Sequence, residues 1–228
     1  MDIAIIPARG GSKRIPRKNI KDFCGQPMIS YAINTALKSR VFDKIIVSTD
    51  DEEIRDVSLK LGAVVPFQRP FNLADDFTPT VPVIAHAISE CENLGWNINY
   101  VACIYPTVPF LSEKDLRTGK EAVQSLSHKY IFTVSEFPAP VQRALKKSNK
   151  GIVKPLDPKN ELLRTQDLIT TYFDAGQFYW AHKSTWKSNP NVHLGGKVIV
   201  IPKWRSVDID DEEDWIRAEK LYKISDLS

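Results

Sequence analysis

Cysteine and histidine are scarce in this chain of 228 residues, and their scarcity excludes several kinds of site. The three cysteines, Cys24, Cys91 and Cys103, are odd in number and widely spaced, so they form neither a disulfide framework nor a zinc site. The four histidines are scattered, without the paired spacing of a metal motif. Reduced thiols are typical of the cytoplasm, where we expect this protein to be located.

Long apolar runs and a large excess of charge are also missing. No run is long enough to span a bilayer, and no signal peptide precedes the first apolar run, so we expect no contact with a membrane. The formal net charge of +3 is too small to indicate a nucleic-acid partner. With 43% hydrophobic and 26% charged residues, the chain is predicted to form a single domain over 1–228 with a sizeable core.

Short apolar runs alternate with helical patterns along the first half of the chain. Strands are predicted at 3–7, 44–50, 64–67, 101–105 and 130–134, with helices from 27, from about 52, over about 80–91 and from 112. Asp50 or Asp51 could cap the second helix, which Gly62 would stop. This alternation predicts an α/β fold with a Rossmann-like, mainly parallel sheet flanked by helices.

The alternation breaks between about 137 and 172, where proline and lysine are frequent and no strong helical pattern appears. We interpret this segment as an arm inserted into the domain. Late strands at 176–181 and 198–201 and a terminal helix at 210–225 complete the domain. Since the arm has no evident core of its own, we expect it to pack on a second copy of the chain in a homodimer.

The loop after the first strand holds two adjacent glycines, Gly10 and Gly11. It also holds five cationic side chains: Arg9, Lys13, Arg14, Arg17 and Lys18. Glycine lets backbone N–H groups approach an anion, and Arg and Lys add charge-assisted hydrogen bonds to phosphate. Neither the P-loop pattern nor the dinucleotide pattern is present. The loop therefore predicts a different polyphosphate cradle, with a solvated basic loop as the alternative.

The same loop carries a family resemblance. Pro7-Ala8-Arg9-Gly10-Gly11-Ser12-Lys13, followed by Pro16-Arg17-Lys18-Asn19, resembles the signature of the CMP-sugar synthetases, which are cytidylyltransferases of the nucleotide-diphospho-sugar transferase fold. The resemblance implies a CTP site formed by Ala8, Arg9, Gly10, Gly11, Ser12, Lys13, Lys18 and Asn19. It further implies that Arg9, Lys13 and Lys18 are catalytic, because they would stabilise charge on the leaving pyrophosphate.

Two more stretches resemble the nucleotide site of this family. Ser48-Thr49-Asp50-Asp51 ends the second strand, where the family carries a similar Ser-Thr-Asp beside the nucleotide, although a helix N-cap is the simpler interpretation. Arg69-Pro70 and the following Leu73-Ala74-Asp75-Asp76 match an Arg-Pro segment whose arginine contacts the nucleotide. Arg69 inherits that role, against the alternative of a surface turn, and Thr78 and Thr80 are predicted to contact the base or ribose.

The sugar site is predicted from stretches farther along the chain. Tyr105 stands where sialic acid synthetases carry a glutamine that touches the sugar, which argues against sialic acid; the alternative is a core-facing tyrosine. The stretches at 140–145, 164–168 and 174–180 resemble the pseudaminic acid branch of the family. Arg143, Arg164 and Gln177 would then bind the carboxylate and polar groups of the sugar acid, while 178–180 is also typical of a buried strand.

The last predicted site is Ser206-Val207-Asp208-Ile209-Asp210. Alternation along an extended segment places the carboxylates of Asp208 and Asp210 on one side, where they could bind Mg²⁺. The family has its metal site at an Asp-x-Asp of this kind, which makes both aspartates catalytic candidates. Asp210 could instead cap the terminal helix, and the two roles can coexist.

These observations predict an enzyme that converts CTP and pseudaminic acid to CMP-pseudaminic acid and pyrophosphate, with Mg²⁺ as cofactor. Its product would serve surface-glycan biosynthesis such as flagellin glycosylation. The anomeric hydroxyl would attack the α-phosphorus in line, and no side chain is identified as general base. Alternatives are the same reaction on N-acetylneuraminic, legionaminic or Kdo sugar acids, or a non-catalytic nucleotide-binding regulator. A regulator is expected to lack the basic loop or the acidic pair, and both are intact.

Overall fold

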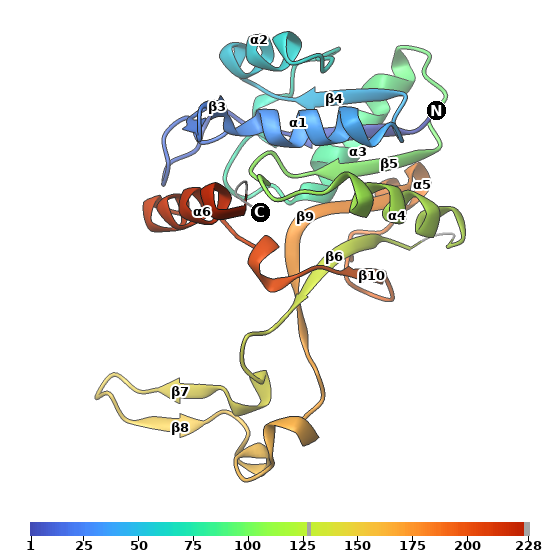
Figure 1. Cartoon of the computed structure of the whole chain (residues 1–228). Helices are drawn as coiled ribbons and strands as arrows, with labels where there is room; N and C mark the ends of the chain where they lie inside the picture. Colours follow the sequence, from blue (N-terminus) through green and yellow to red (C-terminus); the bar gives the residue numbers. More distant parts are fainter. Residues whose placement is uncertain (127–128, 226–228) are drawn as a thin grey trace.

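A six-stranded sheet forms the centre of the molecule, as seen in this computed structural model, which describes residues 1–126 and 129–225 (Figure 1). The strands, in spatial order, are β10 (Lys197–Val200), β6 (Ile131–Glu136), β9 (Tyr172–His182), β5 (Tyr100–Ile104), β1 (Ile3–Pro7) and β4 (Lys44–Ser48). β1 is parallel to β4 and β5, and β10 is parallel to β6, whereas β9 is antiparallel to both of its neighbours. The predicted α/β class with a mainly parallel sheet is confirmed.

Helices cover both faces of this sheet. They are α1 (Met28–Ser39), α2 (Glu52–Lys60), α3 (Thr80–Asn93), α4 (Glu113–Gln124) and α5 (Lys183–Ser188), whereas α6 (Glu212–Ser225) packs in a separate core. The apolar run of β1 explains the two layers, since its successive side chains point to opposite faces. Ala4 and Ile6 pack in the core beneath α1 and α4, and Ile3 and Ile5 pack in the core beneath α3.

A third, smaller core joins the two ends of the chain. Ile15 and Phe23, from the segment after β1, pack with Ile209 and Trp215 at the start of α6. The Phe23 ring meets the Trp215 ring edge to face, with centroids 5.4 Å apart. Phe23 lies in a short hairpin of β2 (Asp22–Phe23) and β3 (Gln26–Pro27), which we had not predicted. This core holds the basic loop beside the acidic segment at 208–210.

Three local predictions are wrong. Residues 64–67 form no strand; Val64 makes one isolated bridge to Ile46, and Pro66 has no N–H to continue the ladder. The terminal helix begins at Glu212 rather than at 210. β9 begins at Tyr172, four residues before the predicted start, and it leads directly into the short helix α5, which was not predicted.

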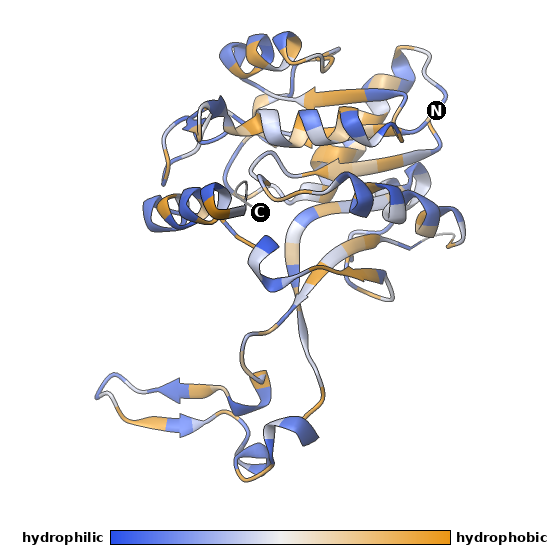
Figure 2. Cartoon of the chain, viewed as in Figure 1, coloured by the Kyte–Doolittle hydropathy of each residue, from blue (hydrophilic) through white to orange (hydrophobic). Residues whose placement is uncertain are grey.

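The segment 137–171 extends away from the sheet as an arm between β6 and β9 (Figure 1). Its two short antiparallel strands are β7 (Leu145–Lys147) and β8 (Val153–Pro155). Apolar residues concentrate in the strands of the sheet, whereas the arm mixes polar and apolar residues along its length (Figure 2). Large apolar side chains of the arm are exposed, among them Leu162 at 95% and Ile169 at 81%. Within the described ranges, no helix has the length and apolar character needed to cross a bilayer.

Candidate active site

A cavity of about 620 Å³ opens where β1 and β5 end. The carboxyl ends of parallel strands lie at the same edge of a sheet, and open α/β sheets bind their ligands there. The predicted site residues among its walls are Arg9, Ser12, Lys13, Lys18, Asn19, Arg69, Thr78, Thr80, Tyr105, Asp208 and Asp210, and Arg14 lies with them. The structure therefore brings together residues from almost the whole length of the chain.

The basic loop forms one wall of the cavity, and two of its cations lie beside the same carboxylate, that of Asp76. Arg9 lies 2.7 Å from Asp76, and Lys13 lies 2.5 Å from the same side chain. Arg9 also donates to the backbone carbonyl of Asp75 at 2.6 Å. These two cations hold the pKa of Asp76 below its usual range. A carboxylate held by two cations occupies a position that suits a phosphate oxygen.

The acidic pair, Asp208 and Asp210, forms another part of the cavity wall. Ile209 is buried in the third core, and the side chains of Asp208 and Asp210 on either side of it line the cavity, as the predicted alternation requires. Arg14 lies 2.7 Å from Asp210, and the amine of Lys18 lies 3.9 Å from it. Burial lowers the pKa of Lys18, while burial and the charge of Asp210 raise the pKa of Asp208.

Asp210 is not the cap of the terminal helix. The side chain of Asp211 accepts a hydrogen bond from the backbone N–H of Asp214 at 3.0 Å, which is the N-cap arrangement. The side chain of Asp214 in turn accepts from the backbone N–H of Asp210 at 3.1 Å. The carboxylate of Asp210 is therefore left to the cavity and its cations.

Asn19 lines the cavity and also holds the basic loop in place. Its side-chain amide donates to the backbone carbonyl of Arg9 at 2.9 Å, which fixes the loop at the point where it leaves β1. Ala8 is fully buried beneath the loop, and its N–H bonds to the Ser48 carbonyl at 2.9 Å. Ala8 thus aligns the loop with β4 and is not one of the cavity walls.

The two glycines also lie outside the walls of the cavity. The N–H of Gly10 donates to the side chain of Asp50 at 3.0 Å, so it already has a partner. A Cβ atom at Gly10 would lie 2.6 Å from a carboxylate oxygen of Asp51, which explains the need for glycine, whereas Gly11 faces open space. Arg17 turns away from the cavity and pairs with Asp51 at 2.5 Å, which also caps α2.

Arg69 lies deep in the cavity wall rather than in a surface turn. It is 5% exposed, and its guanidinium donates to the hydroxyl of Ser48 at 3.1 Å and to the Ser48 carbonyl. Burial lowers its pKa to about 10, so it remains charged at neutral pH. A buried cation held by neutral acceptors is a strong donor for a polar ligand.

The two predicted threonines have different partners. Thr78 is tied to Asp75, whose side chain accepts from the Thr78 hydroxyl at 2.7 Å. The Thr80 hydroxyl bonds the phenol of Tyr105 at 2.8 Å. Tyr105 is a wall of the cavity, so the alternative of a wholly core-facing tyrosine is excluded.

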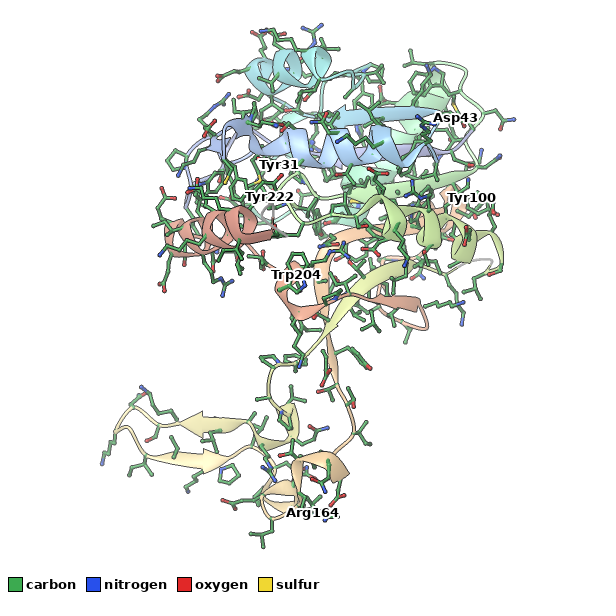
Figure 3. The ribbon with its side chains drawn as sticks, viewed as in Figure 1. Tyr31, Asp43, Tyr100, Arg164, Trp204 and Tyr222 are labelled. Carbon is green, nitrogen blue, oxygen red and sulfur yellow. The ribbon has the colours of Figure 1, made fainter. Side chains whose placement is uncertain are left out.

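The other predicted sugar-binding residues are not among the walls of this cavity. Gln177 is 3% exposed, and its amide donates to the Arg205 carbonyl at 2.8 Å. Arg143 and Arg164 lie on the arm, where Arg164 pairs with Asp167 at 2.8 Å and Arg143 donates to the Leu163 carbonyl. Arg164 lies at the end of the arm farthest from the sheet (Figure 3). Within one chain, these residues do not reach the cavity.

Asp75 and Asp76 were not assigned a role from the sequence, although both line the cavity. The available signal was their position in Leu73-Ala74-Asp75-Asp76, shortly after Arg69-Pro70. Arg14 was counted only as part of the loop charge, and its pairing with Asp210 joins residues 196 positions apart. No local pattern could have predicted that pair.

The carboxylates of the cavity suit a hard divalent cation that keeps water and substrate ligands. In the part of the chain that the structure describes, no group of three or more His, Cys, Asp or Glu side chains forms a complete metal cage. A pair of carboxylates is the usual protein share of a Mg²⁺ site, where phosphates and waters fill the other positions. Asp208 and Asp210 therefore fit Mg²⁺ bound together with a nucleotide.

Comparisons with known proteins identify the class. Residues 3–194 match the family model described as cytidylyltransferase, and the chain belongs to this family. The pseudaminic acid cytidylyltransferase of Campylobacter jejuni is 40% identical over 225 residues, which cover 98% of this chain and 97% of that protein. The CMP-N,N'-diacetyllegionaminic acid synthase of Legionella pneumophila is 28% identical, with the same coverage.

A solved structure shares the fold. CMP:2-keto-3-deoxy-manno-octonic acid synthetase complexed with CTP matches with a TM-score of 0.71 over 98% of this chain and 99% of that one. Its identity to this chain is 14%, so the likeness concerns the fold alone. The fold is that of the nucleotidyltransferases, as predicted.

Proposed function

We propose that the protein transfers CMP from CTP to pseudaminic acid, releasing pyrophosphate. The observation that carries this proposal is that a basic loop, a buried arginine and a pair of aspartates line one cavity at the carboxyl edge of the sheet. Cations suit the phosphates, the arginine suits a polar base edge, and the aspartates suit a divalent ion. The identity of 40% to a pseudaminic acid cytidylyltransferase, against 28% to a legionaminic acid enzyme, favours pseudaminic acid as the sugar.

The residues of the chain divide the work of an in-line transfer. Arg9 and Lys13 exchange Asp76 for the phosphates of CTP, and Lys18 adds charge from its place beside Asp210. Together they stabilise the negative charge that develops on the leaving pyrophosphate. Arg69, held by Ser48, fixes the nucleoside, and Tyr105 contacts the sugar acid. The reaction depends on positioning and charge, which are what these side chains provide.

Asp208 and Asp210 would hold Mg²⁺ in this proposal. When bound, the ion would neutralise charge on the α-phosphate and favour ionisation of the attacking hydroxyl. In its absence, Arg14 and Lys18 lie beside Asp210 and offset part of the negative charge of the pair. Lys18 thus links the acidic pair to the phosphate end of the cavity.

The arm supports a second part of the proposal, a homodimer. Its exposed large apolar residues are Leu145, Ile152, Val153, Leu156, Leu162, Leu163 and Ile169. Apolar side chains in such number have no core within the arm, and a symmetric partner would cover them. Arg143 and Arg164 would then contribute to the sugar site of the partner rather than to their own. We place the reaction in the cytoplasm, ahead of surface-glycan assembly such as flagellin glycosylation.

Pyrophosphate release tests the proposed reaction. The purified protein, CTP and Mg²⁺ are incubated with pseudaminic, legionaminic, N-acetylneuraminic or Kdo sugar acid, and the released pyrophosphate is measured. We expect the highest kcat/KM with pseudaminic acid. Faster release with another sugar would change the substrate and keep the enzyme class. No release with any of the four sugars would contradict the proposal.

A further inference from the structure

Asp76 lies between two cations that the proposed reaction needs for phosphate. One carboxylate oxygen of Asp76 is 2.7 Å from Arg9, and its other oxygen is 2.5 Å from the amine of Lys13. Both oxygens are therefore engaged, as two oxygens of a phosphate group would be. All three side chains are partly exposed along the cavity, so solvent weakens these pairs and a ligand in the cavity can reach them.

The segment that carries Asp76 has few other ties to the domain. Residues 70–78 precede α3 and include one short turn of 3-10 helix. In the part of the chain that the structure describes, the hydrogen bonds and ion pairs from 70–78 to other segments all run to Arg9 and Lys13. The rings of Phe71 and Phe77 are 89% and 88% exposed, so they contribute little packing. A ligand that takes the two cations therefore breaks the main polar attachment of this segment.

The neighbouring carboxylate, that of Asp75, has a different task. It accepts hydrogen bonds from the backbone N–H of Phe77 at 2.9 Å and of Thr78 at 2.6 Å, and from the Thr78 hydroxyl at 2.7 Å. Asp75 thus shapes the turn within the segment, whereas Asp76 reaches across to the basic loop. Two adjacent residues of the same charge consequently serve one local and one long-range contact.

The charge on Arg9 and Lys13 changes during the proposed reaction. CTP and pyrophosphate carry the β- and γ-phosphates that these cations hold, whereas CMP and the sugar product keep only the α-phosphate. A carboxylate carries one negative charge and a pyrophosphate group carries several, so the phosphates displace Asp76 when they are present. When pyrophosphate leaves, the carboxylate is the group nearest to the two cations.

We propose that Asp76 is a specificity-determining residue of the phosphate site, because it competes with the β- and γ-phosphates for Arg9 and Lys13 and takes both cations back as pyrophosphate leaves. This competition weakens the binding of CTP and pyrophosphate, promotes the release of pyrophosphate and leaves the binding of CMP unchanged. The inference rests on the proposed function, because that function places the leaving phosphates against the basic loop.

Isothermal titration calorimetry with the native protein and Asp76→Asn tests the inference. Asparagine has nearly the size of aspartate but no charge. CTP, pyrophosphate and CMP are titrated separately, each with Mg²⁺ and without a sugar acid. We expect the variant to bind CTP and pyrophosphate with a Kd about fivefold lower than the native protein, while the Kd for CMP stays within about twofold. The gain should shrink at high salt, which screens the competing carboxylate.

Two further variants separate this contact from a general effect of charge. Asp75→Asn removes the same charge from the adjacent residue, and the Kd for CTP should stay within about twofold of the native value. Asp76→Glu keeps the charge and should also bind CTP like the native protein. Unchanged or weaker binding of CTP by Asp76→Asn would overturn the inference. An equal gain in Asp75→Asn, or an equal gain for CMP, would also overturn it.

Product inhibition extends the test to the working enzyme. The inhibition constant of pyrophosphate should fall about fivefold in Asp76→Asn, in step with its Kd, and an unchanged inhibition constant would contradict the inference. The calorimetric result stands apart from the proposed reaction, because it needs no sugar acid. A native protein that binds CTP but releases no pyrophosphate with any of the four sugars would refute the reaction, while the titrations would still decide the role of Asp76.

Discussion

The cavity end of the sheet and the arm differ in how their polar groups are satisfied. Around the cavity, residues far apart in sequence pair with each other, as Arg14 does with Asp210 at 2.7 Å and Arg9 with Asp76 at 2.7 Å. On the arm, Arg164 pairs with Asp167 only three residues away, and large apolar side chains remain exposed. The charged walls of the cavity therefore pair across nearly the whole chain, whereas the polar groups of the arm pair within the arm and leave its apolar side chains exposed.

This difference indicates where substitutions should act. Changes in the cavity should affect chemistry without unfolding the chain, because the cores behind it are independent of the charged walls. Changes on the arm should weaken the association of two chains, and activity should fall as a consequence. The four predictions below test this division, from the largest expected effect to the smallest.

The acidic pair should show the largest effect. Asp210→Asn removes a charge and should lower kcat/KM by about 100-fold or more, because the ion that positions the α-phosphate loses a ligand. The remaining activity should need more Mg²⁺, and the melting temperature should change little. Asp211→Ala is the control, since it removes the helix cap and should cost about 1 kcal/mol of stability without changing the Mg²⁺ requirement. If Asp210→Asn lowered stability alone, the metal site would have to lie elsewhere.

The basic loop should show an effect of comparable size. Arg9→Ala and Lys18→Ala should each reduce kcat/KM for CTP by about 2–4 kcal/mol in transition-state stabilisation. Arg17→Ala provides a control from the same loop, because Arg17 faces Asp51 rather than the cavity. It should retain most of the kcat/KM of the native protein. Turnover close to that of the native protein in both Arg9→Ala and Lys18→Ala would contradict the triphosphate assignment.

The role of the arm is tested by measuring whether two chains associate. Leu162→Glu combined with Ile169→Glu places two charges on the exposed apolar surface of the arm. We expect sedimentation to show a dimer for the native protein and a monomer for this variant, with activity reduced about tenfold as the partner arginines leave the sugar site. Leu94→Glu, at an exposed leucine of the main domain, is the control and should remain dimeric. A fully active native monomer at assay concentration would refute the role of the arm.

The smallest effect should come from the pair of Arg17 and Asp51. Arg17 holds the pKa of Asp51 below its usual range, so the folded state binds this proton less readily than the unfolded chain. The resulting stability is present above the unfolded pKa of about 3.9 and is lost as pH falls through the lower folded pKa. Urea unfolding should show Arg17→Met less stable than the native protein by about 1 kcal/mol at pH 7, with the gap closing in acid. A gap independent of pH would show that packing, not charge, holds Arg17.

Prediction from sequence succeeded where a pattern is local. The run Ile3-Ala4-Ile5-Ile6 predicted a strand buried on both faces, and Ile3 and Ala4 indeed lie in different cores. Prediction failed where a single residue interrupted a pattern, as Pro66 did in the expected third strand. The site residues came from the resemblance, and the structure brings those of the basic loop and Asp208-Ile209-Asp210 into one cavity.

The sequence by itself determined the helices other than α5, the strands of the central sheet and the spacing of Asp208 and Asp210, because these follow from backbone geometry over a few residues. Only the tertiary structure decided which side chains meet. The third core of Ile15, Phe23 and Trp215 brings the two ends of the chain together and so sets Arg14 against Asp210. The pairing of β9 with β5 sets the Tyr179 ring edge to face against the ring of Tyr105. Such contacts depend on packing between distant segments, which no local pattern encodes.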